Sequence, residues 1–266
     1  MTSESSFYTF STILTSYHAW LFINNMKYST VIAKCFLCCF LVFKSVFALG
    51  VEELRIGTEG MYPPFEFYKN GEITGFDIEL AKLIAQQLEM KCVFVDMAFS
   101  SLFPAVNVGK IDMAIATITA SAAKRKNFAF SDSYHKDEIG MLYISDKISK
   151  KEDLSGKIIG VQFGSTANVA WVNENCKDTK IIYMDNSNML VEALQAKRLD
   201  AVIVDAPQAK YFAKNNKLKW KLLGTLSDGY RIVMKKDSKL LPRVNDALKT
   251  LISSGAVDKL KKKWEL

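Results

Sequence analysis

Residues 75 to 97 read GFDIELAKLIAQQLEMKCVFVDM, and this stretch decides the fold. Its first half carries apolar residues at helical spacing, and one stripe of the helix would hold Phe76, Leu80, Leu83, Ile84 and Leu88. Its second half, Cys92 to Met97, is a short apolar run that is typical of a buried strand. A similar run, Leu54 to Thr58, precedes it. A strand, a helix and a strand in this order predict a parallel βαβ unit, with Gly75 starting the helix.

The same alternation continues along the chain. Runs rich in Ile, Val and Met predict further strands at Ile111 to Ala116, Ile158 to Gln162, Ile181 to Met184 and Ala201 to Asp205. Helical patterns fit Ser101 to Val108, Ala167 to Asn175, Ser187 to Ala196, Pro207 to Asn215, Leu240 to Ser253 and Ala256 to Trp264. Nearly continuous apolar strands are expected in sheets that are covered on both faces. The predicted fold class is therefore α/β, with mainly parallel sheets flanked by helices.

Two segments interrupt this rhythm. Near Glu138 to Ile144 and again near Tyr230 to Lys235 the chain is extended, and no helix follows in the βαβ order. Two such crossings predict two lobes joined by two hinge strands. We expect residues 49–142 together with 233–266 to form the first lobe, and residues 143–232 to form the second.

Composition excludes several classes of protein. The chain has 266 residues and 29.9 kDa, with 49% hydrophobic and 24% charged residues, which is typical of a folded protein and excludes general disorder. The net charge of +7 is scattered, and its dense runs are Lys124 to Lys126 and Lys259 to Lys263. The second run is explained by the favourable placement of cations in the last turn of a helix. Nucleic-acid binding is therefore not expected.

The amino end has the pattern of an export signal. After Met26 come Lys27, an apolar stretch from Val31 to Phe43, and small residues ending at Ala48. A positive start, a short apolar core and a small-residue cleavage site predict a signal peptide at 26–48 and a periplasmic protein. Residues 1–25 are interpreted as an upstream extension outside the fold.

Cysteine usage gives no sign of a metal centre. Three of the five cysteines fall in the apolar core of the signal, which leaves Cys92 and Cys176 in the exported chain. Neither has the paired spacing of a metal site, so we expect no metal and no cofactor. The two thiols could pair in an oxidising compartment, but isolated thiols are the preferred interpretation.

Polar and aromatic residues follow the predicted strands. Ligands of open parallel sheets bind beyond the carboxyl ends of the strands, so these residues are the candidate site. They are Glu59, Tyr62, Phe99, Thr117, Thr119, Lys124, Gln162, Gly164, Thr166 and Asp205. The collection of hydroxyls, carboxylates, aromatic rings and one nearby cation suits a small zwitterion.

If the ligand is an amino acid, each end of this site has a binding role. Gly164 and Thr166 precede a helix, whose free backbone N–H groups and dipole attract a carboxylate. Lys124, with Thr117 and Thr119, could hold the same carboxylate from the other lobe. Asp205 would balance the α-ammonium, since a buried ammonium without a counter-charge is costly.

The side chain of the ligand would lie between the remaining residues. Tyr62 and Phe99 could clamp it between their faces, and a guanidinium would gain cation–π energy there. Glu59 could accept a hydrogen bond from its far end.

Each residue also has a plainer interpretation. Thr166 and Asp205 could be ordinary helix caps, Tyr62 and Phe99 could be core residues, Glu59 a surface charge and Lys124 a solvated helix residue. The occurrence of all of them at strand ends favours the joint interpretation as a site.

Six segments together resemble the periplasmic amino-acid-binding proteins that serve polar amino-acid ABC transporters, known as family 3 of the bacterial extracellular solute-binding proteins. The resemblance covers residues 53–264 and is carried by Thr58 to Glu66, Gly75 to Ala81, Pro104 to Asp112, Phe130 to Tyr134, Gly160 to Thr166 and Asp200 to Asp205. It implies the two-lobed type II periplasmic-binding-protein fold, which closes on its ligand like a flytrap. It also implies a monomer that delivers a free amino acid to a membrane permease.

The resemblance assigns roles that match the site above, with one departure. It implies Asp205 for the α-ammonium, Thr166 for the carboxylate and Glu59 for the ligand side chain. The family usually places an Arg six residues before the Phe-Ser pair at 130–131, where this chain has Lys124, with Arg125 next to it. Lysine cannot make the two-pronged contact of arginine. Lys124 is favoured as a point charge, and Arg125 is the alternative.

The same resemblance narrows the choice of amino-acid ligand. The pattern from Thr58 to Glu66 and Gln162 is similar to that of arginine-binding members, whereas Ser100 is similar to the glutamine-binding protein. Arginine is favoured, followed by lysine, ornithine and glutamine.

Two other classes share this fold. Some members resemble cyclohexadienyl dehydratase, a lyase, and others are sensor modules. Catalysis would need a poised acid or base in the cleft, and Glu59 is the only plausible group. His135 is expected on the surface beside the hinge. A binding protein is therefore favoured over an enzyme.

Overall fold

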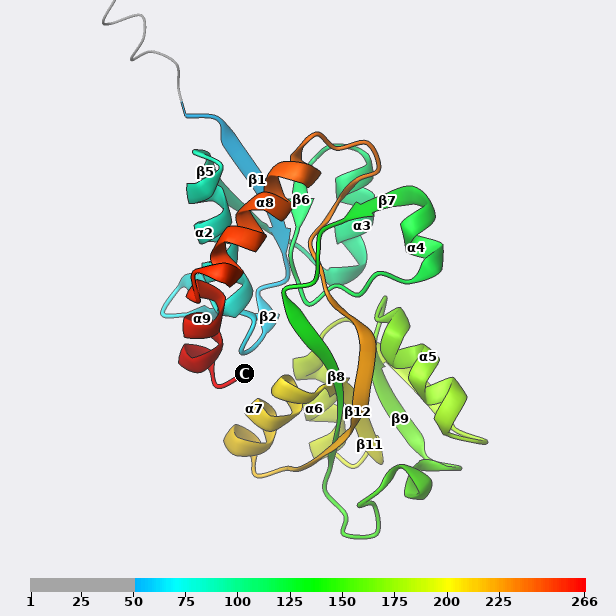
Figure 1. Ribbon diagram of the computed structural model, residues 1–266. Helices are drawn as coiled ribbons and strands as arrows, with labels where there is room; N and C mark the ends of the chain where they lie inside the picture. Colours follow the sequence, from blue (N-terminus) through cyan, green and yellow to red (C-terminus); the bar gives the residue numbers. More distant parts are fainter. Residues whose placement is uncertain (1–50) are drawn as a thin grey trace, which may run out of the picture. The chain divides into compact units, whose positions relative to one another are not determined.

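The first sheet is centred on β1 (Glu53–Thr58), whose two neighbours run parallel to it. One neighbour is β5 (Lys91–Asp96), and the other is the short strand β6 (Met113–Ala114). Strands β13 (Val233–Lys235) and β7 (Phe128–Phe130) extend the sheet in antiparallel fashion. The order is β5-β1-β6-β13-β7. This computed structural model describes residues 51–266, apart from the side chains of residues 226–228 (Figure 1).

The second sheet has the same plan. Strand β9 (Ile158–Gln162) lies between two parallel neighbours, β10 (Lys180–Met184) and β11 (Ala201–Asp205). Strands β8 (His135–Tyr143) and β12 (Lys219–Tyr230) are added antiparallel, in the order β10-β9-β11-β8-β12. The expected α/β class is confirmed, but each sheet is mixed, because the crossing segments add antiparallel strands to a parallel core.

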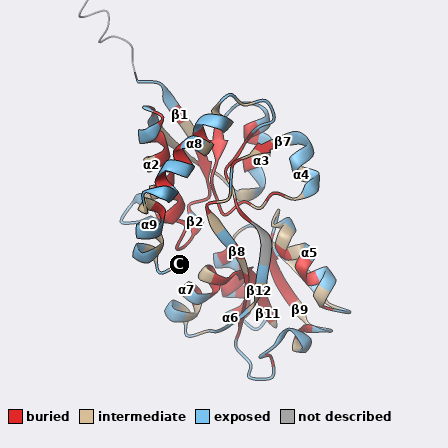
Figure 2. Ribbon diagram, in the orientation of Figure 1, coloured by how far each residue is buried: buried red, intermediate tan, exposed pale blue. Residues whose placement is uncertain are grey.

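Helices cover both faces of each sheet, as the continuous apolar strands predicted. Against the first sheet lie α2 (Phe76–Gln87), α3 (Phe99–Asn107), α4 (Ala122–Asn127), α8 (Leu240–Ser253) and α9 (Ala256–Trp264). Against the second lie the short 3₁₀ helix η1 (Lys151–Leu154), α5 (Thr166–Asn175), α6 (Ser187–Gln195) and α7 (Ala206–Asn216). Figure 2 shows β9, β11 and the inner faces of several helices as largely buried.

The cores follow from alternation along the strands. Leu54 and Ile56 of β1 pack with residues of α2, α8 and α9 on one face of the first sheet. Ala114 and Val233 pack with residues of α3 on the other face. In the second sheet, one core contains residues of α5, and the opposite core contains residues of α6 and α7. Because successive residues of a strand point to opposite faces, each sheet supports two cores.

A three-stranded hairpin sheet after β1 was not anticipated. It comprises β2 (Met61–Tyr62), β3 (Glu66–Lys69) and β4 (Glu72–Thr74), and it contains a cis peptide bond between Pro63 and Pro64. These strands are too short for a periodicity signal. The hairpin brings Tyr62 and Glu66 next to the ends of the parallel strands.

Most expected elements agree with the structure to within a residue or two. The main exceptions are β6, which covers only the middle of the expected strand Ile111 to Ala116, and α4, which was not expected as a helix. Asp112, at the start of that expected strand, forms an ion pair with Arg55 at 2.6 Å, and Thr117, beyond its end, has a positive φ of 44°. Both features end the regular pairing early.

Strands β8 and β12 link the two sheets. They pair with each other from His135 and Tyr230 to Tyr143 and Lys219. The expected crossing at 138–144 therefore lies largely within β8, and the second expected crossing joins the end of β12 to β13. The limits given above for the two lobes remain predictions. The signal peptide at 26–48 and the extension at 1–25 lie outside the described residues.

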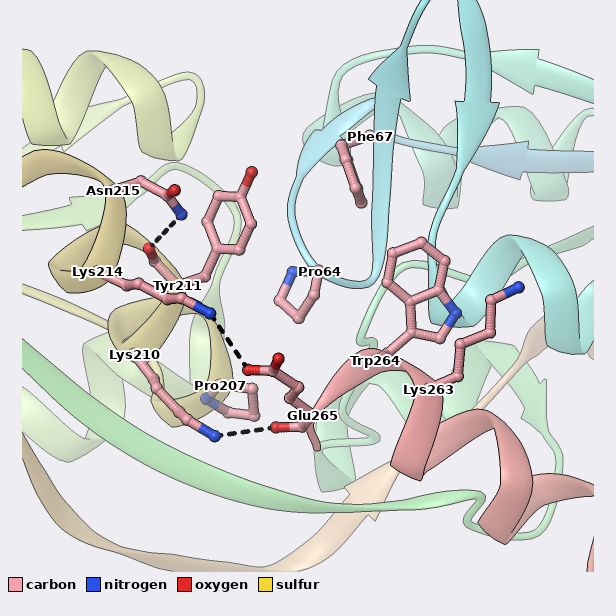
Figure 3. Close-up of a pocket in the computed structure, with 10 residues that line it drawn as sticks. All are labelled: Pro64, Phe67, Pro207, Lys210, Tyr211, Lys214, Asn215, Lys263, Trp264 and Glu265. Carbon is pink, nitrogen blue, oxygen red and sulfur yellow. Dashed lines mark hydrogen bonds and ion pairs between the residues drawn. The ribbon is translucent and has the colours of Figure 1, made fainter.

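The carboxyl-terminal turn also contacts the second lobe. A hollow of about 230 Å³ lies between this turn, the hairpin and α7. Figure 3 shows the residues that line it. Lys210 Nζ donates to the backbone oxygen of Glu265 at 3.1 Å, and Lys214 Nζ lies 3.6 Å from the Glu265 carboxylate. Phe67 contacts Tyr211 with ring centroids 6.2 Å apart. These contacts join the rims of the two lobes away from the parallel strand ends.

Two further findings concern the described residues. Cys92 and Cys176 are free thiols, in agreement with the preferred interpretation. No helix within residues 51–266 combines the length and the apolarity needed to cross a membrane.

Candidate ligand-binding cleft

The predicted site residues meet at the carboxyl ends of the parallel strands. A cleft there is lined by Tyr62, Phe99, Thr117, Thr119, Lys124, Asp137, Gln162, Ser165, Thr166, Ala167, Asn168 and Asp205. Its free volume is about 20 Å³, which is room for about one water molecule. Side chains of the two lobes therefore touch one another across it. Glu59 and Gly164, the other two predicted residues, contact lining residues directly.

Asp205 ends β11 and is the N-cap of α7, but its side chain does not cap the helix. The carboxyl group is 5% exposed and accepts a hydrogen bond of 2.8 Å from the Tyr62 hydroxyl of the other lobe. The plain interpretation of this residue as an ordinary cap is therefore wrong. Burial raises the pKa of Asp205 to about 6, although hydrogen bonds from Tyr62, Tyr230, Thr117 and Asn168 oppose the rise.

Glu59 follows β1 and makes the second contact between the lobes. Its Oε2 accepts a hydrogen bond of 2.7 Å from Gln162 Nε2, at the end of β9. Glu59 is 4% exposed, so the surface-charge interpretation is wrong. Burial raises its pKa to about 7, and the nearby Asp96 and Asp185 act in the same direction.

Lys124 supplies the cation of the cleft. It lies in α4, where its backbone N–H donates to the N-cap Ser121, and its Nζ is 4.4 Å from the centre of the Phe103 ring. Burial lowers its pKa to about 8, because desolvation disfavours the charged form. The alternative, Arg125, is directed elsewhere: its Nε donates to the backbone oxygen of Ala120.

The start of α5 forms one wall of the cleft. Gly164 has a positive φ of 88°, and a Cβ added there would lie 3.3 Å from Phe99. Ser165 is the N-cap but its side chain makes no capping bond, and Thr166 is the first helical residue. The first turn of α5 therefore faces the cleft next to Lys124 and Phe99.

The floor of the cleft comes from the segment after β6. Thr117 has a left-handed backbone that is uncommon for a β-branched residue, and its N–H donates to Asp77 Oδ2 at 3.0 Å. Thr119 forms an isolated bridge with Tyr230 at the end of β12. Strain of this kind clusters at ligand sites, where surrounding contacts hold it in place.

Four lining residues were missed by sequence reasoning: Asp137, Ser165, Ala167 and Asn168. Ser165 and Ala167 are neighbours of Thr166 and could have been included with it. Asp137 and Asn168 carried no signal, because the direction of a hinge-strand residue and the rotation of a helix depend on tertiary packing.

His135 lies beside the hinge as expected, at the start of β8, but its side chain is half-buried rather than on the surface. Its ring stacks on Tyr230, with centroids 5.6 Å apart, and also contacts Phe65 and Phe76. Burial lowers its pKa to about 4, so the ring is neutral. The start of β8 lies against the aromatic side chains beside the hairpin, and this placement leaves the imidazole half-buried.

The chemistry of the cleft is that of hydrogen bonding and charge pairing. Among residues 51–266, no group of three or more His, Cys, Asp or Glu side chains is arranged to hold a metal ion. The two acids Asp205 and Glu59 are buried and the cation Lys124 is half-buried, and the pKa of each is shifted toward neutrality. Such groups respond strongly to a ligand that brings opposite charges.

The comparison with protein families identifies the chain. Residues 54–266 match the model of the bacterial extracellular solute-binding proteins, family 3. The chain belongs to this family. Family 3 membership agrees with the resemblance noted from the six segments, and the described fold is that of its type II periplasmic binding proteins.

Individual members of family 3 are similar over most of their length. The arginine-binding extracellular protein ArtP of Bacillus subtilis (strain 168) is 32% identical over 226 residues, which cover 81% of this chain and 87% of ArtP. The structure of an ancestral arginine-binding protein bound to arginine is 36% identical with a TM-score of 0.73, and it covers 80% of this chain and 97% of its own.

An ancestral amino-acid-binding protein described as a precursor of cyclohexadienyl dehydratase is also similar. It is 34% identical with a TM-score of 0.73, and the match covers 80% of this chain and 95% of that one.

Proposed function

We propose that this chain is the extracytoplasmic substrate-binding component of an amino-acid ABC transporter and that it binds L-arginine. One observation carries the proposal: the buried carboxyl group of Asp205 and the half-buried ammonium of Lys124 line the same cleft, and the buried carboxyl group of Glu59 bonds Gln162, which also lines it. Arginine presents the complementary set, because it has an α-ammonium, a guanidinium and one carboxylate. Asp137 also lines the cleft, but it already has an interaction partner.

The α-ammonium and the α-carboxylate of arginine fit the two ends of the cleft. Asp205 takes the α-ammonium and exchanges its bond from Tyr62 for charge-assisted bonds from the ligand. The ligand carboxylate binds at the first turn of α5, where Thr166 and backbone N–H groups face Lys124 across the cleft. Thr117 and Thr119 offer hydroxyls at the floor.

The ligand side chain lies between Tyr62 and Phe99, and its guanidinium pairs with Glu59. Gln162, which bonds Glu59 in the structure, can share that carboxylate with the guanidinium. ArtP and the ancestral structure, which are named for arginine, support this choice.

Binding requires the lobes to separate and close again. A free volume of about 20 Å³ cannot hold an amino acid, so entry breaks the Tyr62–Asp205 and Glu59–Gln162 bonds. The ligand then supplies partners to the same groups in both lobes. Because these contacts exist only when both lobes reach the ligand, binding shifts the population toward the closed form.

The transport role implies a place and a partner. Residues 26–48 direct export to the periplasm, and the closed protein delivers its ligand to a membrane permease. The protein works as a monomer without cofactor, metal or nucleic acid.

Calorimetry on the purified exported chain tests the proposal. Titration with L-arginine is expected to give tight one-to-one binding, with weaker binding of lysine, ornithine and glutamine. Absence of heat with every one of these amino acids would contradict it.

A second candidate is a lyase that acts on a cyclohexadienyl acid. It rests on Glu59, whose pKa of about 7 is suited to proton transfer. The similar precursor of cyclohexadienyl dehydratase is itself described as an amino-acid-binding protein, which favours binding over catalysis. Incubation with prephenate distinguishes the two. We expect no product, and its formation would favour the lyase.

A further inference from the structure

Two carboxyl side chains lie buried directly behind the floor of the cleft. Glu66 begins β3 and is 1% exposed, and Asp77 lies in the first turn of α2 and is fully buried. The two carboxyl groups lie close enough to shift each other's pKa. Neither residue lines the cleft, so the proposed binding site does not use them.

A hydrogen bond between two carboxyl groups requires a proton. Asp77 Oδ2 accepts from the Thr117 N–H at 3.0 Å and from the Tyr134 hydroxyl at 2.8 Å. Among the described residues, neither Asp77 Oδ1 nor Glu66 Oε2 has a hydrogen-bond partner. Buried polar atoms are almost always hydrogen-bonded. A proton held between the two carboxyl groups satisfies this requirement.

The surroundings decide which group holds the proton. The charged groups that act on Glu66 are Asp77, Glu59 and Asp205, and all of them are acidic. Burial is the largest cause that raises the pKa of Glu66, which lies well above its usual value. His135, which reaches α2 through the ring of Phe76, is neutral and supplies no charge.

Asp77 is in a better place to be ionised. It accepts two hydrogen bonds, from the Thr117 N–H and the Tyr134 hydroxyl, and lies in the first turn of a helix, where the dipole favours a negative charge. Burial raises its pKa to about 7, and the bonds from Thr117 and Tyr134 oppose the rise. Glu66 is therefore the donor and Asp77 the acceptor.

We propose that Glu66 is a protonated acid that donates to Asp77, and that Asp77 is a positioning residue for Thr117 at the floor of the cleft. Thr117 holds a left-handed backbone, its N–H is fixed by Asp77, and its hydroxyl bonds Asp205. The pair thus sets the position of Asp205 through one intervening residue. Only the affinity test below rests on the proposed arginine binding.

Infrared spectroscopy tests the protonation without any ligand. At about pH 8, where Glu59 and Asp77 are mostly ionised, we expect the C=O band of a buried protonated carboxyl group, and Glu66→Gln should remove it. The exposed acid Glu192 of α6 provides the control, since Glu192→Gln should leave the band in place. A missing band, or a band that survives Glu66→Gln, would overturn the assignment.

Substitutions at Asp77 test the positioning role. Asp77→Asn keeps an acceptor for Thr117 and Tyr134 and gives Glu66 a donor, so arginine affinity should stay within about threefold. Asp77→Ala removes the acceptor and should weaken arginine binding about tenfold or more, the scale of one lost buried partner.

Nuclear magnetic resonance reports directly whether Asp77 holds the Thr117 N–H in place, which a general loss of stability would not reveal. The amide signal of Thr117 should shift strongly in Asp77→Ala and only slightly in Asp77→Asn. If Asp77→Ala does not fold, the Asp77→Asn and Glu66→Gln spectra still decide the proposal. An unchanged Thr117 signal and unchanged affinity in a folded Asp77→Ala protein would contradict it.

Discussion

Asp205 occupies a position where an aspartate usually caps a helix, yet its carboxyl group turns into the cleft and binds the Tyr62 hydroxyl of the other lobe. The helix start gives up a capping bond, which commonly contributes about 1 kcal/mol. A carboxyl group that is buried at this cost and lacks a fixed cation has a strong requirement for a cationic ligand. The same holds for Glu59, which is buried against Gln162.

Asp205→Ala should weaken arginine binding by about 2–5 kcal/mol, because the buried α-ammonium would have no counter-charge. Calorimetry on the variant measures this loss. Asp258→Ala, which removes an exposed acid of α9, is the matched control and should bind as the unmodified protein does. Unchanged affinity in Asp205→Ala would remove this residue from the site.

Glu59→Gln should shift the ligand preference from arginine toward glutamine. The variant loses the charge that pairs with the guanidinium, so arginine affinity should fall by about tenfold or more, whereas glutamine has no charge there to lose. Parallel titrations with both amino acids measure the ratio. Equal losses for the two ligands would show that Glu59 does not face the ligand side chain.

Arginine affinity should also depend on pH in both directions. Asp205 and Glu59 have pKa values raised to about 6 and about 7, and the ligand cations favour their ionised forms, so affinity should fall as the pH drops below about 7. Lys124, with its pKa lowered to about 8, loses its charge above that pH, and affinity should fall again.

Calorimetry in buffers of different ionisation enthalpy should show proton release on binding near pH 6.5, roughly midway between those two acids. Glu59→Gln should shift the acid limb to lower pH. Affinity that is flat between about pH 5.5 and about pH 7.5 would contradict these assignments.

At the scale of elements, the cleft depends on how each strand ends. The turn between β9 and α5 passes Gly164 with a positive φ of 88°, and this brings the helix start within contact of Phe99. The same element shows how far sequence reasoning could reach. Parallel topology alone placed Glu59, Thr117, Gln162 and Asp205 at one edge, because the ends of parallel strands meet there.

Other features could not be predicted from local patterns. The hairpin after β1 is too short for periodicity, so neither the partial burial of His135 nor the pairing of Glu66 with Asp77 was foreseeable. Asp137 was missed because a hinge strand gives no sign of which of its residues faces the ligand. These positions depend on contacts between segments that are far apart in the sequence.

Gly164→Ala should lower both stability and arginine affinity. A positive φ costs an alanine about 1 kcal/mol, and the new Cβ would press on Phe99. Gly156→Ala is the matched control, since Gly156 has a φ of 71° but open space around it. Thermal melts should show similar losses in both variants, and only Gly164→Ala should bind arginine more weakly. Equal arginine affinity in the two variants would show that this turn does not contribute to ligand binding.

At the scale of the whole described region, two sets of contacts oppose separation of the lobes: the bonds across the cleft and the rim contacts of Glu265 with α7 (Figure 3). The carboxyl-terminal turn is itself held to the first lobe, because Lys263 binds Glu79 at 2.7 and 2.9 Å. We therefore expect the rim contacts to act as a second clasp that favours the closed form.

The double variant Lys210→Met, Lys214→Met should open the lobes more often and weaken arginine binding by about two- to fivefold, since exposed ion pairs contribute about 0.2–1 kcal/mol each. Small-angle scattering of the ligand-free protein should show a larger radius of gyration. Lys221→Met, an exposed cation of β12 away from the rim, serves as the control. An unchanged radius and affinity in the double variant would contradict the clasp.

The central claim is that the two lobes close on an amino acid whose charges are met by Asp205, Glu59 and Lys124. A crystal structure grown with L-arginine tests it most directly. We predict that the α-ammonium of arginine lies within hydrogen-bond distance of Asp205 and that its carboxylate lies between Lys124 and the first turn of α5. The guanidinium should lie at Glu59. Arginine bound in the reverse direction, or bound outside this cleft, would contradict it.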